Sequence, residues 1–183
     1  WRTAGRAGCS RAPFVLVAMP QPPEPGAGRP LAMPRSRKVS APAFTACCAA
    51  AAGARGFVGI AFRLQSDMKS YDTFYLRPTN GRADDQERRN HAVQYASSPD
   101  WPWFRLRKET PSKYEAYVDL VPGAWTKIKI EVRGDRARLY VHGQEQPTLI
   151  VNDVKTGAQA RGAVALSPGP GTIAHFRNLT IQP

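Results

Sequence analysis

Residues 125–142, WTKIKIEVRGDRARLYVH, decide the class of fold. Apolar and polar residues alternate on both sides of Arg133-Gly134-Asp135, whose glycine suits a tight turn. A period of two residues is that of a β-strand with one buried face. The segment therefore predicts a β-hairpin with arms at residues 125–132 and 137–142.

The same period recurs from residue 57 almost to the C-terminus. It predicts further strands at residues 57–64, 71–77, 91–96, 103–108, 114–120, 149–151, 162–166 and 173–181. In the first strand Val58, Ile60, Phe62 and Leu64 are expected on one face and Arg63 on the other. No helix is predicted, so the crossovers that a parallel sheet needs are missing. The sequence therefore predicts an all-β fold, an antiparallel two-sheet sandwich or jelly roll.

Composition changes abruptly near residue 56. Residues 1–55 are rich in Ala, Gly, Pro and Arg and show little periodicity. We therefore predict an irregular segment at 1–55 and one β-sandwich domain at 56–183. Residues 33–47 loosely imitate a signal peptide, with a basic start and a small-residue end. We favour a disordered or non-native segment, the latter through out-of-frame translation of GC-rich sequence, over a signal.

Charge and cysteine content limit the classes of partner and cofactor. Of the net charge of +12, residues 1–55 carry +7, and the remainder, with eighteen basic and thirteen acidic residues, carries +5. This modest excess does not predict nucleic-acid binding, and residues 14–19 are too short to span a membrane. Cys9, Cys47 and Cys48 all precede residue 56, and no Cys/His spacing suits zinc. No cofactor is expected, and Asp84-Asp85 offers calcium fewer oxygen ligands than a dedicated site has.

Four segments resemble a known family: GFVGIAFR (56–63), FYLRPTNGRADDQERRNHAVQY (74–95), the long block at 101–143 and HFRNLTI (175–181). Together they are similar to concanavalin A-like, laminin-G/glucanase-type jelly rolls, and most of all to the bacterial 3-keto-disaccharide hydrolase-like domains. The resemblance implies two sheets, one concave, a carbohydrate-related function and an extracellular or periplasmic location. Such domains have strands before the equivalent of residue 56, so it also implies a missing edge strand and self-association through an open edge.

The long polar insert after residue 76 is the candidate binding site. Proteins hold sugars with aromatic rings and planar hydrogen-bonding side chains. The expected ligand-binding residues of this kind are Tyr75, Arg77, Asn80, Arg82, Asp85, Gln86, Arg89, Asn90, His91, Gln94, Tyr95, Trp101, Trp103 and Arg105. Trp103 and Arg105 are expected on one face of a strand. The alternative is a loop in which the acidic and basic residues of 82–89 pair with one another.

A catalytic role requires acidic or basic side chains at a defined separation. Glycoside hydrolysis uses two carboxyl groups about 5 Å or about 6.5–9.5 Å apart. Glu115 and Asp119 are the nearest match, but four residues of strand separate them by roughly 13 Å. Asp85, Glu109 and His91 remain as catalytic candidates. The sequence therefore favours a non-catalytic, lectin-like carbohydrate-binding module, with a hydrolase or lyase of 3-keto-disaccharides as the alternative and a protein-interaction sandwich as the second alternative.

Overall fold

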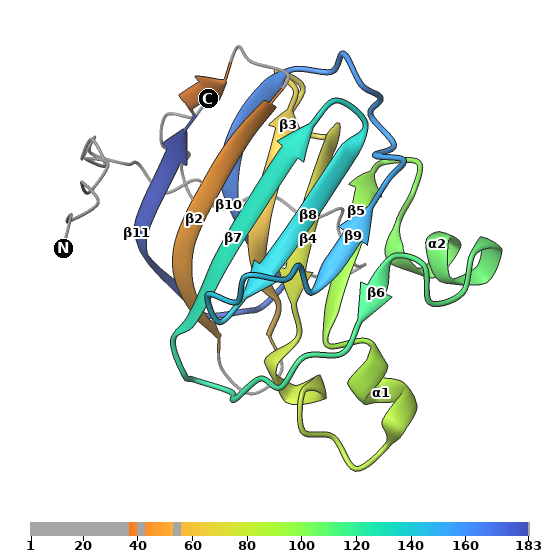
Figure 1. Ribbon diagram of the computed structural model, residues 1–183, viewed down its shortest axis with the longest axis vertical. Coiled ribbons are helices and arrows are strands. Elements are labelled where there is room, and N and C mark those ends of the chain that lie inside the picture. Colours follow the sequence, from red (N-terminus) through yellow and green to blue (C-terminus); the bar gives the residue numbers. More distant parts are fainter. Residues whose placement is uncertain (1–36, 40–42, 53–55, 183) are drawn as a thin grey trace, which may run out of the picture.

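The computed structural model describes residues 37–39, 43–52 and 56–182, which form two β-sheets packed face to face (Figure 1). The six-stranded sheet has the order β1-β10-β3-β4-β5-β6, and the five-stranded sheet has the order β11-β2-β7-β8-β9. Neighbouring strands are antiparallel throughout. The predicted all-β sandwich is confirmed.

The strands are from two to ten residues long. Those of the six-stranded sheet are β1 (Arg37–Val39), β10 (Gly162–Pro168), β3 (Val58–Leu64), β4 (Tyr71–Leu76), β5 (Val93–Ser98) and β6 (Glu115–Ala116). Those of the five-stranded sheet are β11 (Ala174–Gln182), β2 (Ala43–Ala52), β7 (Thr126–Arg133), β8 (Arg136–Val141) and β9 (Leu149–Val151).

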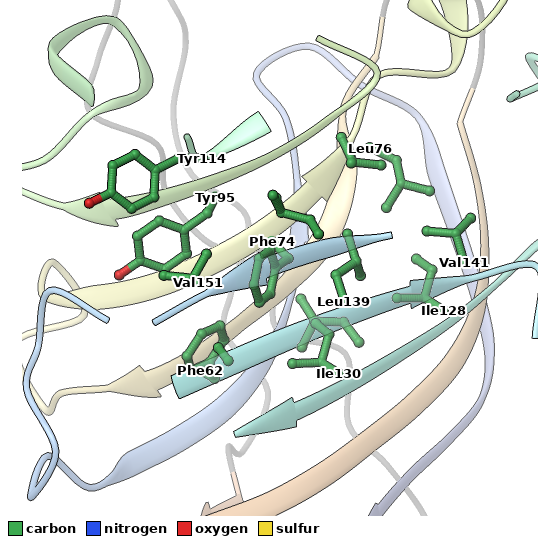
Figure 2. Close-up of a cluster of buried hydrophobic side chains, with 14 of the residues drawn as sticks. Phe62, Phe74, Leu76, Tyr95, Tyr114, Ile128, Ile130, Leu139, Val141 and Val151 are labelled. Carbon is green, nitrogen blue, oxygen red and sulfur yellow. The ribbon is translucent and has the colours of Figure 1, made fainter. Parts of the chain in front are cut away.

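The hydrophobic core fills the space between the two sheets (Figure 2). Phe62, Phe74 and Leu76 of one sheet meet Ile130 and Leu139 of the other, and all five are almost completely buried. The rings of Phe62 and Phe74 stack with centroids 5.9 Å apart. Burial alternates along β7, as the sequence predicts, because inward apolar residues remove their surface from water.

One strand departs from the predicted alternation at Arg63. Its φ of 54° and a register shift between β3 and β10 mark a β-bulge. Because an extra residue reverses the faces that follow it, Arg63 is buried and donates to the carbonyl oxygens of Gly157, at 2.7 Å, and Gly134. Leu64 instead packs on the opposite face with Tyr71.

The expectation that no helix is present is wrong. A 3-10 turn η1 (Pro78–Asn80) and two short helices, α1 (Gln86–Asn90) and α2 (Trp103–Glu109), occur in the connections. The predicted strand at 103–108 is therefore a helix, whose start Pro102 favours through its fixed φ. Of the predicted strand at 114–120, only β6 forms. Neither α-helix in the described residues is long and apolar enough to cross a membrane.

Two strands lie before the boundary predicted at residue 56. β1 forms an edge of the six-stranded sheet, and β2 lies inside the five-stranded sheet, between β11 and β7, so the strand that was expected to be missing is present. The sequence of β2, AFTACCAAAA, has no polar–apolar alternation, which is why periodicity did not reveal it. The predictions for residues 1–36 lie outside the described residues, and self-association through a sheet edge stays a prediction.

Candidate functional site

A pocket of about 580 Å³ opens on the outer face of the six-stranded sheet. Tyr71, Thr73 and Tyr75 of β4 form its floor. They alternate along the strand with Asp72 and Phe74, which are fully buried on the other side. The strand period therefore places a row of hydroxyl-bearing side chains away from the core.

Aromatic side chains form the walls of the pocket. Phe57 lies 5.5 Å from the ring of Tyr75, and Trp103 meets Phe104 edge-on with centroids 5.8 Å apart. Trp103 is 40% exposed and Phe104 is 60% exposed. These rings can therefore offer flat apolar surface to a ligand.

Few polar groups complete the lining. Ser98 and Ser167 add hydroxyl groups beside those of β4, and Lys69 stands on the turn between β3 and β4. Among the described residues that line the pocket, Lys69 is the single charged one, and none is a carboxylate or a histidine. The pocket thus combines apolar walls with a neutral, hydrogen-bonding floor.

Arg77 holds three of the aromatic rings together. Its Cζ lies 5.3 Å from the ring centroid of Phe57, 5.1 Å from that of Tyr75 and 5.4 Å from that of Trp103, within the range of cation–π attraction. Its Nη2 donates to the hydroxyl of Tyr75 at 3.1 Å. Burial raises the pKa of Tyr75 to about 12, so this phenol is neutral at neutral pH.

A partly buried ion pair fastens α2 to the sheet beside the pocket. Glu115 on β6 accepts hydrogen bonds from Nε and Nη2 of Arg107, at 3.0 and 2.7 Å. The side chain of Glu115 is only 4% exposed. Trp103 lies one turn before Arg107, whose Cζ is 4.8 Å from its ring, so the pair also fixes Trp103.

His91 and Gln94 extend this polar cluster. Nε2 of His91 lies 3.3 Å from Oε1 of Glu115, and burial lowers the pKa of His91 despite that neighbouring charge, which leaves it neutral at pH 7. Gln94 lies between Tyr75 and Glu115 in the sheet register. It is fully buried, and neither of its polar side-chain atoms has a partner among the described residues.

The structure therefore brings part of the predicted site together. Tyr75 and Trp103 line the pocket and Arg77 supports them. Gln94 and His91 lie in the adjoining polar cluster.

The predicted residues of the polar insert have structural contacts instead. Nδ2 of Asn80 donates to the carbonyl of His91, and Arg82 pairs with Asp119 rather than with a neighbour in the loop. Asp85 caps α1 by accepting from the amide of Glu87 at 2.8 Å. The remaining three lie on α1, and none of them lines the pocket: Gln86, Arg89 and Asn90.

Tyr95 and Arg105 are placed differently from the prediction. Tyr95 points into the core (Figure 2). Its hydroxyl donates to Asp72 at 2.6 Å. Because residues 103–109 form a helix, Arg105 does not share the face of Trp103. Its Cζ lies 4.0 Å from the ring of Trp101, and its Nε donates to Glu109 at 2.7 Å.

Several pocket residues were missed by the sequence analysis. Tyr71 and Thr73 share the period of Tyr75 and could have been found by extending that alternation. Phe57, Phe104 and Ser167 come from separate segments, and only folding shows that they meet.

The described residues contain no group of three or more His, Cys, Asp or Glu side chains that could hold a metal ion. Of the two carboxylates Asp84 and Asp85, Asp85 already serves as the cap of α1.

The two sheets and the pocket on the outer face define a protein of the concanavalin A-like β-sandwich class. A family model described as the 3-keto-alpha-glucoside-1,2-lyase-like domain matches residues 45–182. The chain belongs to this family, as the resemblance predicts. The match begins within β2, in agreement with the place of that strand in the fold.

Solved structures show the same fold at low sequence identity. The carbohydrate binding module CBM66 from Bacillus subtilis has 15% identity and a TM-score of 0.57, over 81% of this chain and 78% of that one. Sheep galectin-11, in a complex with glycerol, has 12% identity and a TM-score of 0.52, over 83% of this chain and 99% of that one. Galectin LEC-6 of Caenorhabditis elegans has 11% identity and a TM-score of 0.53, over 81% of this chain and 89% of that one. A search of curated proteins gives no match.

Proposed function

We propose that the pocket binds carbohydrate and that the domain is a non-catalytic sugar-binding module. The observation that carries this proposal is the set of exposed rings, above all Trp103, beside the hydroxyl groups of Thr73 and Ser167. A sugar presents apolar C–H faces to rings and hydroxyl groups to hydrogen-bonding side chains. The pocket matches both surfaces.

The similar structures support this proposal. One is described as a carbohydrate binding module, and another is a galectin in a complex with glycerol, which is itself a polyol. They share the fold of this chain, so a sugar site on the sheet is compatible with the architecture.

The lining of the pocket favours binding over hydrolysis. Hydrolysis of a glycosidic bond normally requires two carboxyl groups that flank it. The described lining has none, while Asp85 caps α1 and Glu109 pairs with Arg105. Two of the three catalytic candidates are thus engaged away from the pocket.

A second candidate function is lyase activity on 3-keto-glucosides, favoured by the family match and by the position of His91. A neutral imidazole held by a carboxylate can accept a proton. Incubation of the protein with a 3-keto-α-glucoside tests this function. Release of the aglycone by the wild type but not by His91→Gln, with equal thermal stability of the two proteins, would support the lyase function. If the wild type releases no aglycone, sugar binding remains as the proposed function.

Sugar binding is tested with a matched pair of tryptophan variants. A panel of neutral, acidic and 3-keto sugars is screened by thermal shift, because a ligand of the folded state raises the melting temperature. Calorimetry then compares the best ligand in Trp103→Ala and Trp125→Ala. Trp125 is similarly exposed, at 44%, but it precedes β7 and contacts Arg177 of β11, so it lies on the five-stranded sheet and away from the pocket.

We expect at least about 10-fold weaker binding in Trp103→Ala, the loss of roughly one stacking contact. We expect unchanged binding in Trp125→Ala. Equal effects of the two substitutions, or no sugar bound by the folded protein, would contradict the proposal.

A further inference from the structure

Three arginines gather on the opposite side of the molecule from the pocket, on the outer face of the five-stranded sheet. Arg133 ends β7, and Arg136 and Arg138 lie on β8. All three are exposed, because they alternate with the buried Val132 and Ala137. Together with Glu131 they surround a cleft of about 350 Å³, which we call the arginine cleft.

The positive charge of the arginine cleft is not balanced by its one carboxylate. Glu131 accepts from Nζ of Lys129 at 2.9 Å and from the hydroxyl of Tyr140 at 2.8 Å, so each of its oxygens already has a partner. The hydrogen bond from Lys129 also lowers the pKa of Glu131. Glu131 is therefore ionised at neutral pH but already paired with a cation.

The three guanidinium groups are not held in this way, although the charge of Arg138 also lowers the pKa of Glu131. None of them forms an ion pair with another described residue. Arg133 and Arg136 are also directly opposite each other in the register of the hairpin. Like charges in this position repel each other, so an anion bound between them would relieve the repulsion.

We propose that the arginine cleft binds an acidic polysaccharide through its carboxylate groups. A guanidinium group donates two parallel hydrogen bonds to a carboxylate, which is the geometry that arginine provides and lysine does not. Arg138 lies opposite Glu131 in the register, so the cleft also contains a hydrogen-bond acceptor. A ligand with both acidic groups and hydroxyl groups can use both features.

The same features disfavour a nucleic acid. Binding of a single-stranded nucleic acid relies on open aromatic rings on which its bases can stack. Nζ of Lys129 covers the ring of Tyr140 at 3.9 Å, so that ring is not open for the stacking of bases. The occupant of the cleft is therefore an acidic glycan, bound independently of the pocket on the other sheet.

The test compares two triple variants of the full chain that lose the same charge. The first is Arg133→Gln, Arg136→Gln and Arg138→Gln. The control is Arg88→Gln, Lys108→Gln and Arg161→Gln, three exposed cations outside the five-stranded sheet. Calorimetry measures the binding of polygalacturonate at low and at physiological salt, and thermal melting checks the fold.

We expect at least 10-fold weaker binding in the arginine-cleft variant and less than a 2-fold change in the control. Added salt should weaken binding to the wild type, because it screens exposed charges. The arginine-cleft variant should bind the neutral sugar that the pocket prefers as tightly as the wild type does, which separates this site from the pocket. Equal losses in the two triple variants, no binding by the wild type, or tighter binding of a single-stranded oligonucleotide or of phosphatidylserine vesicles would overturn the proposal.

Discussion

Two arginine–carboxylate pairs of the same geometry differ mainly in burial, and this difference predicts the effect of Glu115→Gln. Arg107 donates to Glu115 from Nε and Nη2 at 3.0 and 2.7 Å, and Arg82 donates to Asp119 in the same way at 2.7 and 2.8 Å. The side chains of the first pair are 29% and 4% exposed, and those of the second are 63% and 52% exposed.

The loss in the free energy of unfolding depends on the groups that each substitution leaves unpaired. Glu115→Gln removes the negative charge and one of the two acceptor oxygens, and a hydrogen bond to a charged group contributes about 1.5–3 kcal/mol. Arg107 can recover part of its hydration, so we expect a loss of about 2 kcal/mol in the free energy of unfolding, below the roughly 3–5 kcal/mol of a fully buried pair. Asp119→Asn should leave stability nearly unchanged, because water screens the exposed pair.

Urea unfolding measures both effects. The midpoint should fall in Glu115→Gln without a change in the slope, and Asp119→Asn should unfold like the wild type. Because the pair fixes α2 and therefore Trp103, sugar affinity should also fall in Glu115→Gln. A loss below about 1 kcal/mol in Glu115→Gln, or an equal loss in both variants, would refute the argument that burial decides the strength of these pairs.

Three further predictions concern the fold. Phe74→Ala should cost about 3–5 kcal/mol in urea unfolding, because this ring is fully buried between the sheets, and a cost near zero would place it outside the core. Gly59→Ala should cost about 1–3 kcal/mol, because a Cβ atom there would lie 2.1 Å from the carbonyl oxygen of Phe74, and an unchanged midpoint would contradict this close contact. Burial opposes the ionisation of Asp153, yet hydrogen bonds from Tyr114 and two lysines lower its pKa to about 2. A carboxyl group whose pKa is lowered by folding stabilises the folded state at any pH above its pKa in the unfolded chain, which is about 4. The free energy of unfolding should therefore fall as the pH drops from about 4 toward 2, and it should fall less in Asp153→Asn.

The alternation of apolar and polar residues predicted most strands of the sandwich. It worked for β7 and β8 because each strand buries one face, and the hairpin turn at Gly134 has the positive φ of 57° that favours glycine. It failed for β2, whose small residues carry no pattern, and at Arg63, where a bulge reverses the faces. A helix of seven residues such as α2 is also too short to show a distinct period.

The sequence predicts only part of the candidate site, Tyr75 on β4 and Trp103 on α2. Tyr75 was found because the pattern of β4 places it away from the core. Tyr95 is predicted at the site as an aromatic residue of the segment around the polar insert, whereas its ring is fully buried and its hydroxyl donates to Asp72 in the interior. Phe57 and Ser167 meet Tyr75 only through the pairing of β3 with β4 and β10, which local patterns do not show.

The position of a bound sugar tests the central claim most directly. The measurement is a crystal structure of the protein with the sugar that gives the largest thermal shift. We predict a sugar ring in the pocket, against Trp103 or Tyr75, with its hydroxyl groups bonded to the side chains of β4. A sugar bound elsewhere, with this pocket left to solvent, would contradict the claim that the outer face of the six-stranded sheet is the sugar site.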